Sequence, residues 1–97
     1  MFAYEVDAAA TAAFEAAYGP DGEWTRFFRA GAGYLGTELW RAAEDPPRYL
    51  LVDRWRSSGD QAAFLEAHAD EYRRRSEAGE ALYRRETSLG RFTAVAS

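Results

Sequence analysis

The first part of the chain changes from a strand pattern of hydrophobic and polar residues to a helix pattern. Residues 2–7 alternate larger apolar side chains with small or polar ones, as in a strand with one covered face. The Ala-rich segment 8–18 has the composition of a helix, with Asp7 as its N-cap and Gly19 and Pro20 at its end. We therefore predict a strand followed by a helix.

Two further strands are predicted after a short helical segment. Residues 24–28 carry three aromatic side chains at helical spacing, and we expect them in the core. Residues 34–43 and 48–56 predict two strands, joined by a turn at 44–47 whose two prolines exclude a helix. Residues 49–52 are all apolar, which is typical of a strand that is covered on both faces.

A second helix and a last strand complete the pattern. Ser58 is the expected N-cap of this helix, with Gln61 three residues later in a capping-box spacing. Residues 82–96 predict the last strand, with Gly90 as a bulge within it. One inward stripe is expected on the helix, made of Leu65, His68, Ala69 and Tyr72.

The order strand, helix, strand, strand, helix, strand predicts one α+β domain over residues 1–97. It is the split βαβ (βαββαβ) arrangement of ferredoxin-like folds, an antiparallel four-stranded sheet with both helices on one face. The helices leave the other face bare, although residues 49–52 are apolar on both sides. We therefore expect a homodimer that pairs through the open sheet face.

Composition narrows the classes of partner and compartment. The chain of 97 residues is 47% hydrophobic, enough to build a core, and its net charge of −4 argues against nucleic acid or an anionic membrane as partner. The absence of Cys excludes disulfides, thiolate metal sites and a cysteine nucleophile. No signal peptide or membrane span is apparent, so we expect a cytoplasmic protein. No spacing of metal ligands and no phosphate or dinucleotide motif is found, so no metal or cofactor is predicted.

Several segments of the chain together form a familiar set: residues 33–39, Asp45-Pro46, residues 49–57, Phe64 and His68. They resemble the antibiotic biosynthesis monooxygenase (ABM) family of dimeric α+β barrels. Residues 14–24 resemble a subgroup of this family whose members mostly have no assigned activity. The resemblance implies a mostly apolar cavity in each subunit and a homodimer whose two sheets form a barrel. Family chemistry includes cofactor-free oxidation of polycyclic phenols or anthrones, quinol oxidation and haem degradation, while other members bind ligands or serve in stress responses.

The resemblance also argues against haem degradation. The haem-degrading branch uses an Asn on the first strand with a Trp and a His on the second helix. This chain has no Asn, and it carries Glu5 on the first strand and Ala67 near the place of that Trp. The cofactor-free quinone-forming branch also uses an Asn, together with Trp, Tyr and Arg. Those last three residue types are plentiful here.

His68 and Asp53 are the predicted catalytic residues. His68 is the only His, and imidazole is the general base best suited to neutral pH. On its helix it is expected to face the sheet, within reach of Asp53, which would orient the ring and raise its basicity. The alternative is a core His whose hydrogen bond is satisfied by Asp53 or by a backbone carbonyl.

Aromatic residues and one Arg are the predicted substrate-binding residues. Arg54 should point away from Asp53 and Trp55, since strand side chains alternate. It would pair with Glu38 on the neighbouring strand or bind an anionic ligand such as a phenolate. The aromatic residues could line a pocket for a flat substrate or simply fill the core. The aromatic candidates are Tyr4, Trp40, Trp55 and Tyr72, and Tyr34 and Tyr49 could belong to the same pocket.

Three hypotheses for the function follow. The first is a cofactor-independent monooxygenase, or a related isomerase or cyclase, that acts on a small aromatic or polyketide-like molecule. The second is a non-catalytic module for small-molecule binding or stress response that uses the same cavity. The third is an interaction unit whose cavity is filled by its own aromatic side chains.

Overall fold

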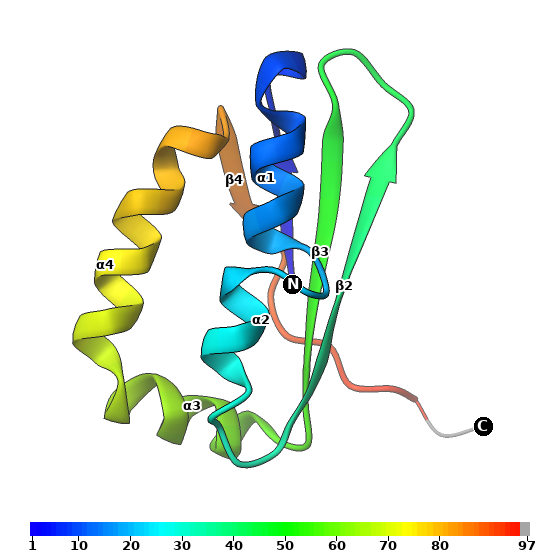
Figure 1. The fold of residues 1–97 in the computed structure, drawn as a ribbon. Helices are drawn as coiled ribbons and strands as arrows, with labels where there is room; N and C mark the ends of the chain where they lie inside the picture. Colours follow the sequence, from blue (N-terminus) through cyan, green and yellow to red (C-terminus); the bar gives the residue numbers. More distant parts are fainter. Residues whose placement is uncertain (96–97) are drawn as a thin grey trace.

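The computed structural model describes residues 1–95, and its four strands form one antiparallel sheet (Figure 1). The order of elements along the chain and the antiparallel pairing confirm the predicted α+β, ferredoxin-like fold. Across the sheet the strands lie in the order β2-β3-β1-β4. Their bounds are β1 (Phe2–Glu5), β2 (Tyr34–Ala42), β3 (Arg48–Trp55) and β4 (Arg85–Ser88).

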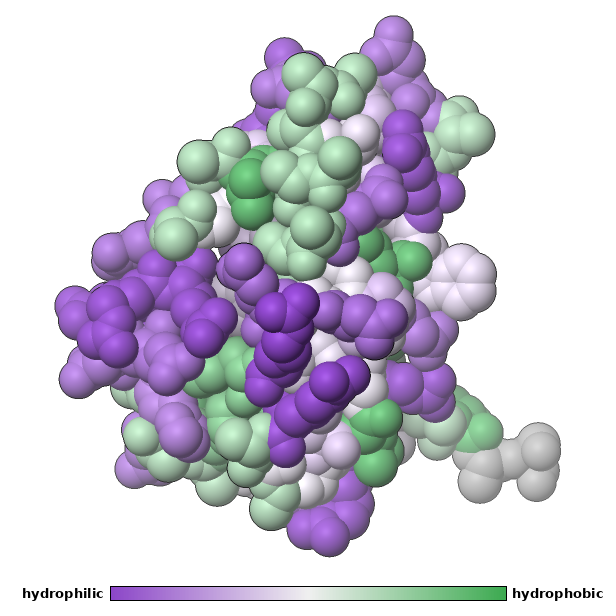
Figure 2. Space-filling view, viewed as in Figure 1, coloured by the Kyte–Doolittle hydropathy of each residue, from purple (hydrophilic) through white to green (hydrophobic). Residues whose placement is uncertain are grey.

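The helical elements lie together on one face of the sheet (Figure 1). Hydrophilic side chains gather over α4, whereas the surface over the Ala-rich α1 is paler and more apolar (Figure 2). No helix in the described part of the chain is both long and apolar enough to cross a membrane. The bounds are η1 (Ala8–Ala10), α1 (Thr11–Tyr18), α2 (Glu23–Phe28), α3 (Ser58–Ala67), α4 (Ala69–Gly79) and η2 (Glu80–Leu82).

Two aromatic clusters form the core between the helices and the sheet. In the first, Phe14 of α1 is fully buried and stacks on Tyr18, with ring centroids 4.5 Å apart. The second gathers Phe27 and Phe28 of α2 around Phe64 of α3. The short helix α2 therefore supplies core residues, as its aromatic spacing predicted. Burial of several large rings is the main stabilising term for so small a sheet.

The predicted second helix is two helices, and its predicted cap is wrong by one residue. Ser57, not Ser58, is the N-cap, because its extended backbone lets its hydroxyl accept a hydrogen bond from the Asp60 amide at 3.1 Å. His68 leaves the helical conformation, with φ −120° and ψ 30°, and separates α3 from α4. This break redirects the chain from the end of the sheet to a course along its length (Figure 1).

The last strand is much shorter than predicted. It covers only Arg85–Ser88, because its one partner β1 is itself four residues long and pairs Phe2 with Ser88. Gly90 lies beyond the strand, at φ +96°, and is not a bulge within it. Residues 82–96 were predicted as one strand, and residue 96 lies outside the described residues.

Alternation along the strands distributes side chains between the helix-covered face and the other, open face. On β3, Tyr49 and Leu51 are buried under the helices, whereas Leu50 and Val52 are only half-buried on the open face. Trp40 of β2 also lies on the open face and is 60% exposed. The sheet thus has one face that is sealed within the chain and one that is not.

Candidate active site

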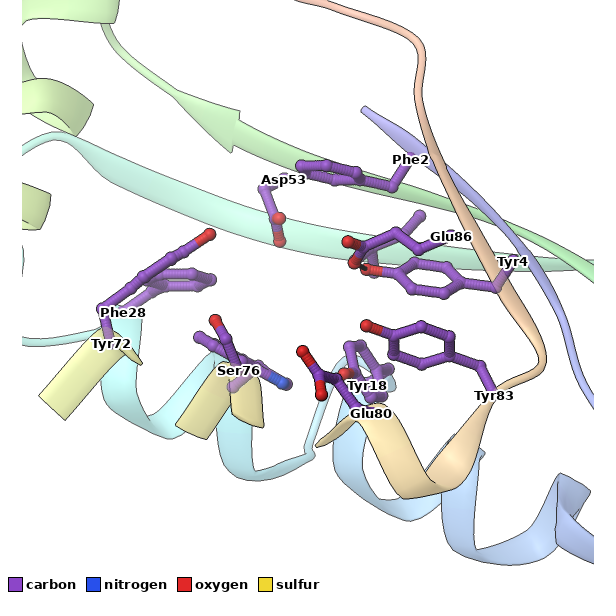
Figure 3. A pocket seen from close by; sticks show the side chains of 12 residues that line it. Phe2, Tyr4, Tyr18, Phe28, Asp53, Tyr72, Ser76, Glu80, Tyr83 and Glu86 are labelled. Carbon is purple, nitrogen blue, oxygen red and sulfur yellow. Dashed lines mark hydrogen bonds between the residues drawn. The ribbon is translucent and has the colours of Figure 1, made fainter. Parts of the chain in front are cut away.

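A cavity of about 140 Å³ lies between the sheet and the helices (Figure 3). This is about the size of a cavity that holds one benzene molecule. Strands β1, β3 and β4 form one wall, and α1, α2, α4 and η2 form the other. The lining side chains are Phe2, Tyr4, Tyr18, Trp24, Phe28, Leu51, Asp53, Tyr72, Ser76, Glu80, Tyr83 and Glu86.

Asp53 of β3 is one of two carboxyl groups that the sheet presents to this cavity. Strand alternation places it on the covered face, two residues after Leu51, and Thr37 lies opposite it on β2. The Thr37 hydroxyl donates to Asp53 Oδ1 at 2.8 Å and is itself hydrogen-bonded to the Tyr34 hydroxyl. Burial raises the pKa of Asp53, and the hydrogen bond from Thr37 opposes that rise. A fixed carboxyl with a raised pKa is suited to proton transfer.

A second carboxyl, Glu86, enters from the other side of β1. Tyr4 and Glu86 are paired residues on adjacent strands, so both face the cavity, and the Tyr4 hydroxyl donates to Glu86 Oε2 (Figure 3). Burial raises the pKa of Tyr4, and the bond to Glu86 raises it further. Tyr4 therefore stays protonated and holds the carboxylate in place.

Three more tyrosines line the cavity from the helical side. Burial raises the pKa of Tyr18 to about 12 and also raises the pKa values of Tyr72 and Tyr83. Their hydroxyls therefore remain neutral at pH 7 and can donate hydrogen bonds. The close approach of α4 to α1 depends on Gly79, because a Cβ at that position would collide with the Tyr18 hydroxyl.

The structure does not form the predicted Asp53–His68 pair. His68 is exposed at the junction of α3 and α4, and it is not among the residues that line the cavity. Its ring instead lies against Phe64 and Phe27, at centroid distances of 4.4 and 5.9 Å. The prediction assumed one continuous helix, in which His68 would face the sheet, but the helix is broken at His68 itself. A catalytic role for His68 stays a prediction that the geometry does not favour.

The structure divides the other predicted site residues between the cavity and the rest of the sheet. Tyr4 and Tyr72 line the cavity, as does Asp53. Trp55 lies on the covered face, but it packs on Phe28, Tyr34 and Phe64 outside the cavity. Its indole Nε1 is buried without a hydrogen-bond partner among the described residues.

Trp40 and Arg54 lie on the open face, away from the cavity. The predicted salt bridge is confirmed, since Arg54 Nη1 lies 2.7 Å from Glu38 Oε2. The Trp40 indole donates to the other oxygen of Glu38 at 3.1 Å. These residues form a polar and aromatic group on the surface that has no helix over it.

Sequence reasoning missed Glu86, Glu80 and Tyr83 as cavity residues. Alternation in the last strand could have identified Glu86, but only if the pairing register between β4 and β1 had been known. Glu80 lies in η2, and Tyr83 directly follows this turn, where the prediction had a strand beginning at Leu82. No local sequence signal marks such a short 3-10 turn.

The cavity combines groups that can move a proton with rings that can hold a flat or apolar ligand. Asp53 can accept a proton, and the tyrosine hydroxyls can stabilise negative charge that develops on a substrate oxygen. Within residues 1–95, no cluster of three or more His, Asp or Glu side chains is arranged to hold a metal ion. The arrangement is therefore one of acid–base groups in an aromatic enclosure.

Comparison with known proteins identifies the family. No curated protein and no solved structure matches the chain significantly. The family model described as "Antibiotic biosynthesis monooxygenase" (ABM) matches residues 1–78, which include β1 to β3 and most of the helical layer. The ABM family includes monooxygenases. Because the match covers well over half of its residues, this chain belongs to the antibiotic biosynthesis monooxygenase family.

Proposed function

We propose that this protein is a cofactor-independent monooxygenase acting on a small aromatic or polyketide-like molecule, with Asp53 as its proton acceptor. The observation that carries the proposal is the position of Asp53, a half-buried carboxyl of raised pKa in a cavity walled by aromatic rings. Membership of a family that includes monooxygenases supports this reaction class, and the cavity offers a place for the substrate. Aromatic walls exclude water from a flat substrate and strengthen electrostatic interactions inside.

The reaction would begin with transfer of a proton from an acidic CH2 group of the substrate to the Asp53 carboxylate. The resulting carbanion gives one electron to O2, and the radical pair combines to a peroxide anion. Asp53 returns its proton to this anion, and the hydroperoxide then loses water. The net change converts CH2 and O2 into C=O and H2O, and O2 is the only oxidant. Tyrosine hydroxyls near Asp53 would donate to the substrate oxygen on which negative charge develops.

The test is oxygen uptake and product formation with a panel of one- to three-ring compounds, namely anthrones and phenols whose keto tautomer carries a CH2 group, because the cavity of about 140 Å³ holds about one ring. Asp53→Asn keeps an acceptor for the Thr37 hydroxyl but cannot take a proton, so we expect a loss in kcat of about 10²–10⁴-fold. Asp21→Asn, at a side chain that is 99% exposed, is the matched control and should keep full activity.

Two outcomes would redirect the proposal. Unchanged turnover by Asp53→Asn would remove Asp53 from the mechanism. Tight binding of a panel compound that is recovered unchanged after aerobic incubation would favour the non-catalytic binding module instead.

We further propose that the open sheet face pairs with a second copy of this chain. Large apolar side chains on this face, Leu35 and Trp40, are 67% and 60% exposed. Leu50 and Val52, on the same face, are only half-buried. Burying these side chains against a second copy would remove their apolar surface from water.

A further inference from the structure

The aromatic wall of the cavity is continuous. Ring centroids lie 5.0 Å apart for Tyr4 and Tyr83, and 5.3 Å apart for Tyr4 and Tyr18. The chain of rings continues from Tyr18 to Trp24 at 6.1 Å and from Trp24 to Tyr72 at 5.5 Å. All five residues also line the cavity. A ligand inside would therefore meet π-faces or ring edges from several directions.

The charge of the cavity lining has a single sign. Three of the twelve lining residues are acidic, namely Asp53, Glu80 and Glu86, and none of the twelve is basic. The carboxyl groups come from β3, η2 and β4 and point toward the same space between sheet and helices (Figure 3). The chain has 12 Arg residues, so basic side chains were available but are placed elsewhere.

Two arginines that neighbour cavity residues in the sequence have other partners. Arg84, between Tyr83 and the strand that carries Glu86, pairs with Asp7 at 3.1 Å. Arg75, next to Ser76 on α4, pairs with Glu71 at 2.8 Å and lies over the Phe27 ring. The negative charge in the cavity is therefore not balanced by an arginine in its wall.

We infer that this cavity selects an organic cation, such as a protonated amine or a quaternary ammonium group, over neutral and anionic molecules of the same shape. Cations are attracted to the faces of Trp and Tyr rings, and carboxylates beside those rings add to the attraction. The volume of about 140 Å³ fits one ring or one trimethylammonium head group. An anionic ligand would meet like charges and no compensating Arg.

This inference rests on the proposed function in one respect, because it takes the same cavity as the ligand site. It adds the charge of the substrate: an aromatic or polyketide-like molecule bearing an amine, whose cationic end enters the cavity. The enclosing rings then hold the cation, and Glu86, fixed by the Tyr4 hydroxyl, is a specificity-determining residue.

The test uses three probes of nearly one shape with charges of +1, 0 and −1: choline, 3,3-dimethylbutan-1-ol and 3,3-dimethylbutanoate. NMR titration of the wild-type protein gives an affinity for each probe and locates its contacts. We expect choline to bind on the order of tenfold more tightly than the neutral alcohol, with shifts at the cavity residues. We expect no saturable binding of the carboxylate.

Two variants with one control test the source of the selectivity. Glu80 and Glu86 are both exposed, at the edge of the cavity. Glu86→Gln keeps an acceptor for the Tyr4 hydroxyl but removes the charge, and Glu80→Gln removes the other charge at this edge. Each should reduce choline affinity several-fold and leave the affinity for the alcohol unchanged. Glu66→Gln, at an exposed residue outside the cavity lining, should change neither affinity. Near-UV circular dichroism verifies that each variant is folded.

The results separate this inference from the proposed function. Binding of the alcohol as tightly as choline, tightest binding of the carboxylate, or binding of no probe would each overturn selection for a cation. The oxygen-uptake assay with neutral phenols would still decide the oxygenase proposal in any of those cases. Cation selectivity with no oxygen uptake would support this inference and contradict the oxygenase.

Discussion

The two faces of the sheet differ in how completely their side chains are buried and hydrogen-bonded within the chain. Under the helices, Tyr49 and Leu51 are only 3% and 5% exposed, and Asp53 and the Tyr49 hydroxyl hydrogen-bond to side chains of neighbouring elements. On the open face, Leu35 and Trp40 remain 67% and 60% exposed. One face is a packed core that contains a cavity, and the other is a surface with large apolar side chains exposed.

Two carboxyl groups make the same contrast in electrostatic terms. Asp53 and Glu38 lie on neighbouring strands but on opposite faces. Burial raises the pKa of Asp53, whereas hydrogen bonds from Arg54 and Trp40 lower the pKa of Glu38. The covered face thus favours a carboxyl that can hold a proton, and the open face favours a fixed negative charge.

The largest expected effect on stability comes from removing a buried side chain under the helices. Phe14→Ala removes a fully buried ring that stacks on Tyr18, and we expect a loss of about 3–5 kcal/mol in the free energy of unfolding. Phe92→Ala, at a ring that is 68% exposed, should change it by less than about 0.5 kcal/mol. Urea unfolding at one protein concentration measures both. Similar losses would contradict the contrast between the packed core and the exposed segment.

A smaller but qualitative effect is expected from charging the open face. Trp40→Glu places a carboxylate where we propose that two copies meet, so the protein should become monomeric while its helices and sheet remain intact. Sedimentation velocity and far-UV circular dichroism measure the two properties. Arg74→Glu, an exposed charge reversal on α4, should leave the dimer unchanged. A wild-type protein that is monomeric at all concentrations would refute the paired sheets.

Much of the fold could be predicted because it depends on local periodicity. Alternation around Tyr4 and the turn at 44–47 defined strands that the structure contains, and the sheet then followed from their order. Alternation also placed Asp53 and Arg54 on opposite faces, and the pairing of Arg54 with Glu38 was confirmed. These features need no knowledge of distant contacts.

The candidate site was less predictable because it depends on where elements end. A helix counted without interruption through His68 turns that residue inward, but the break there leaves it exposed. Glu86 enters the cavity only because β4 pairs with β1 in one register. Such registers are decided by the packing of the whole sheet, which no short segment encodes.

The pH dependence of the free energy of unfolding tests the difference between the two carboxyl groups, beginning with Asp53. Its folded pKa is raised above the usual value of 3.8, so the native state binds a proton more tightly than the unfolded chain. Stability should therefore fall as the pH rises from that value through the raised pKa. Asp53→Asn should remove this part of the slope and be no less stable than wild type at pH 7. A variant with the wild-type slope would show that Asp53 does not carry the shift.

The smallest effect, of opposite sign, is expected from Glu38. Arg54 and Trp40 lower its folded pKa below 4.5, so its contribution is present above that value and is lost as the pH falls through the lowered pKa. Glu38→Gln should reduce the loss of stability on going to acidic pH. Asp53→Asn should instead reduce the loss of stability as the pH rises. Because this ion pair is solvent-exposed in the single chain, added salt should weaken its contribution. In a dimer the pair would be shielded, so its loss should matter more at protein concentrations where the chain is dimeric than at concentrations where it is monomeric. Equal effects at the two concentrations would show that the second copy does not cover Glu38.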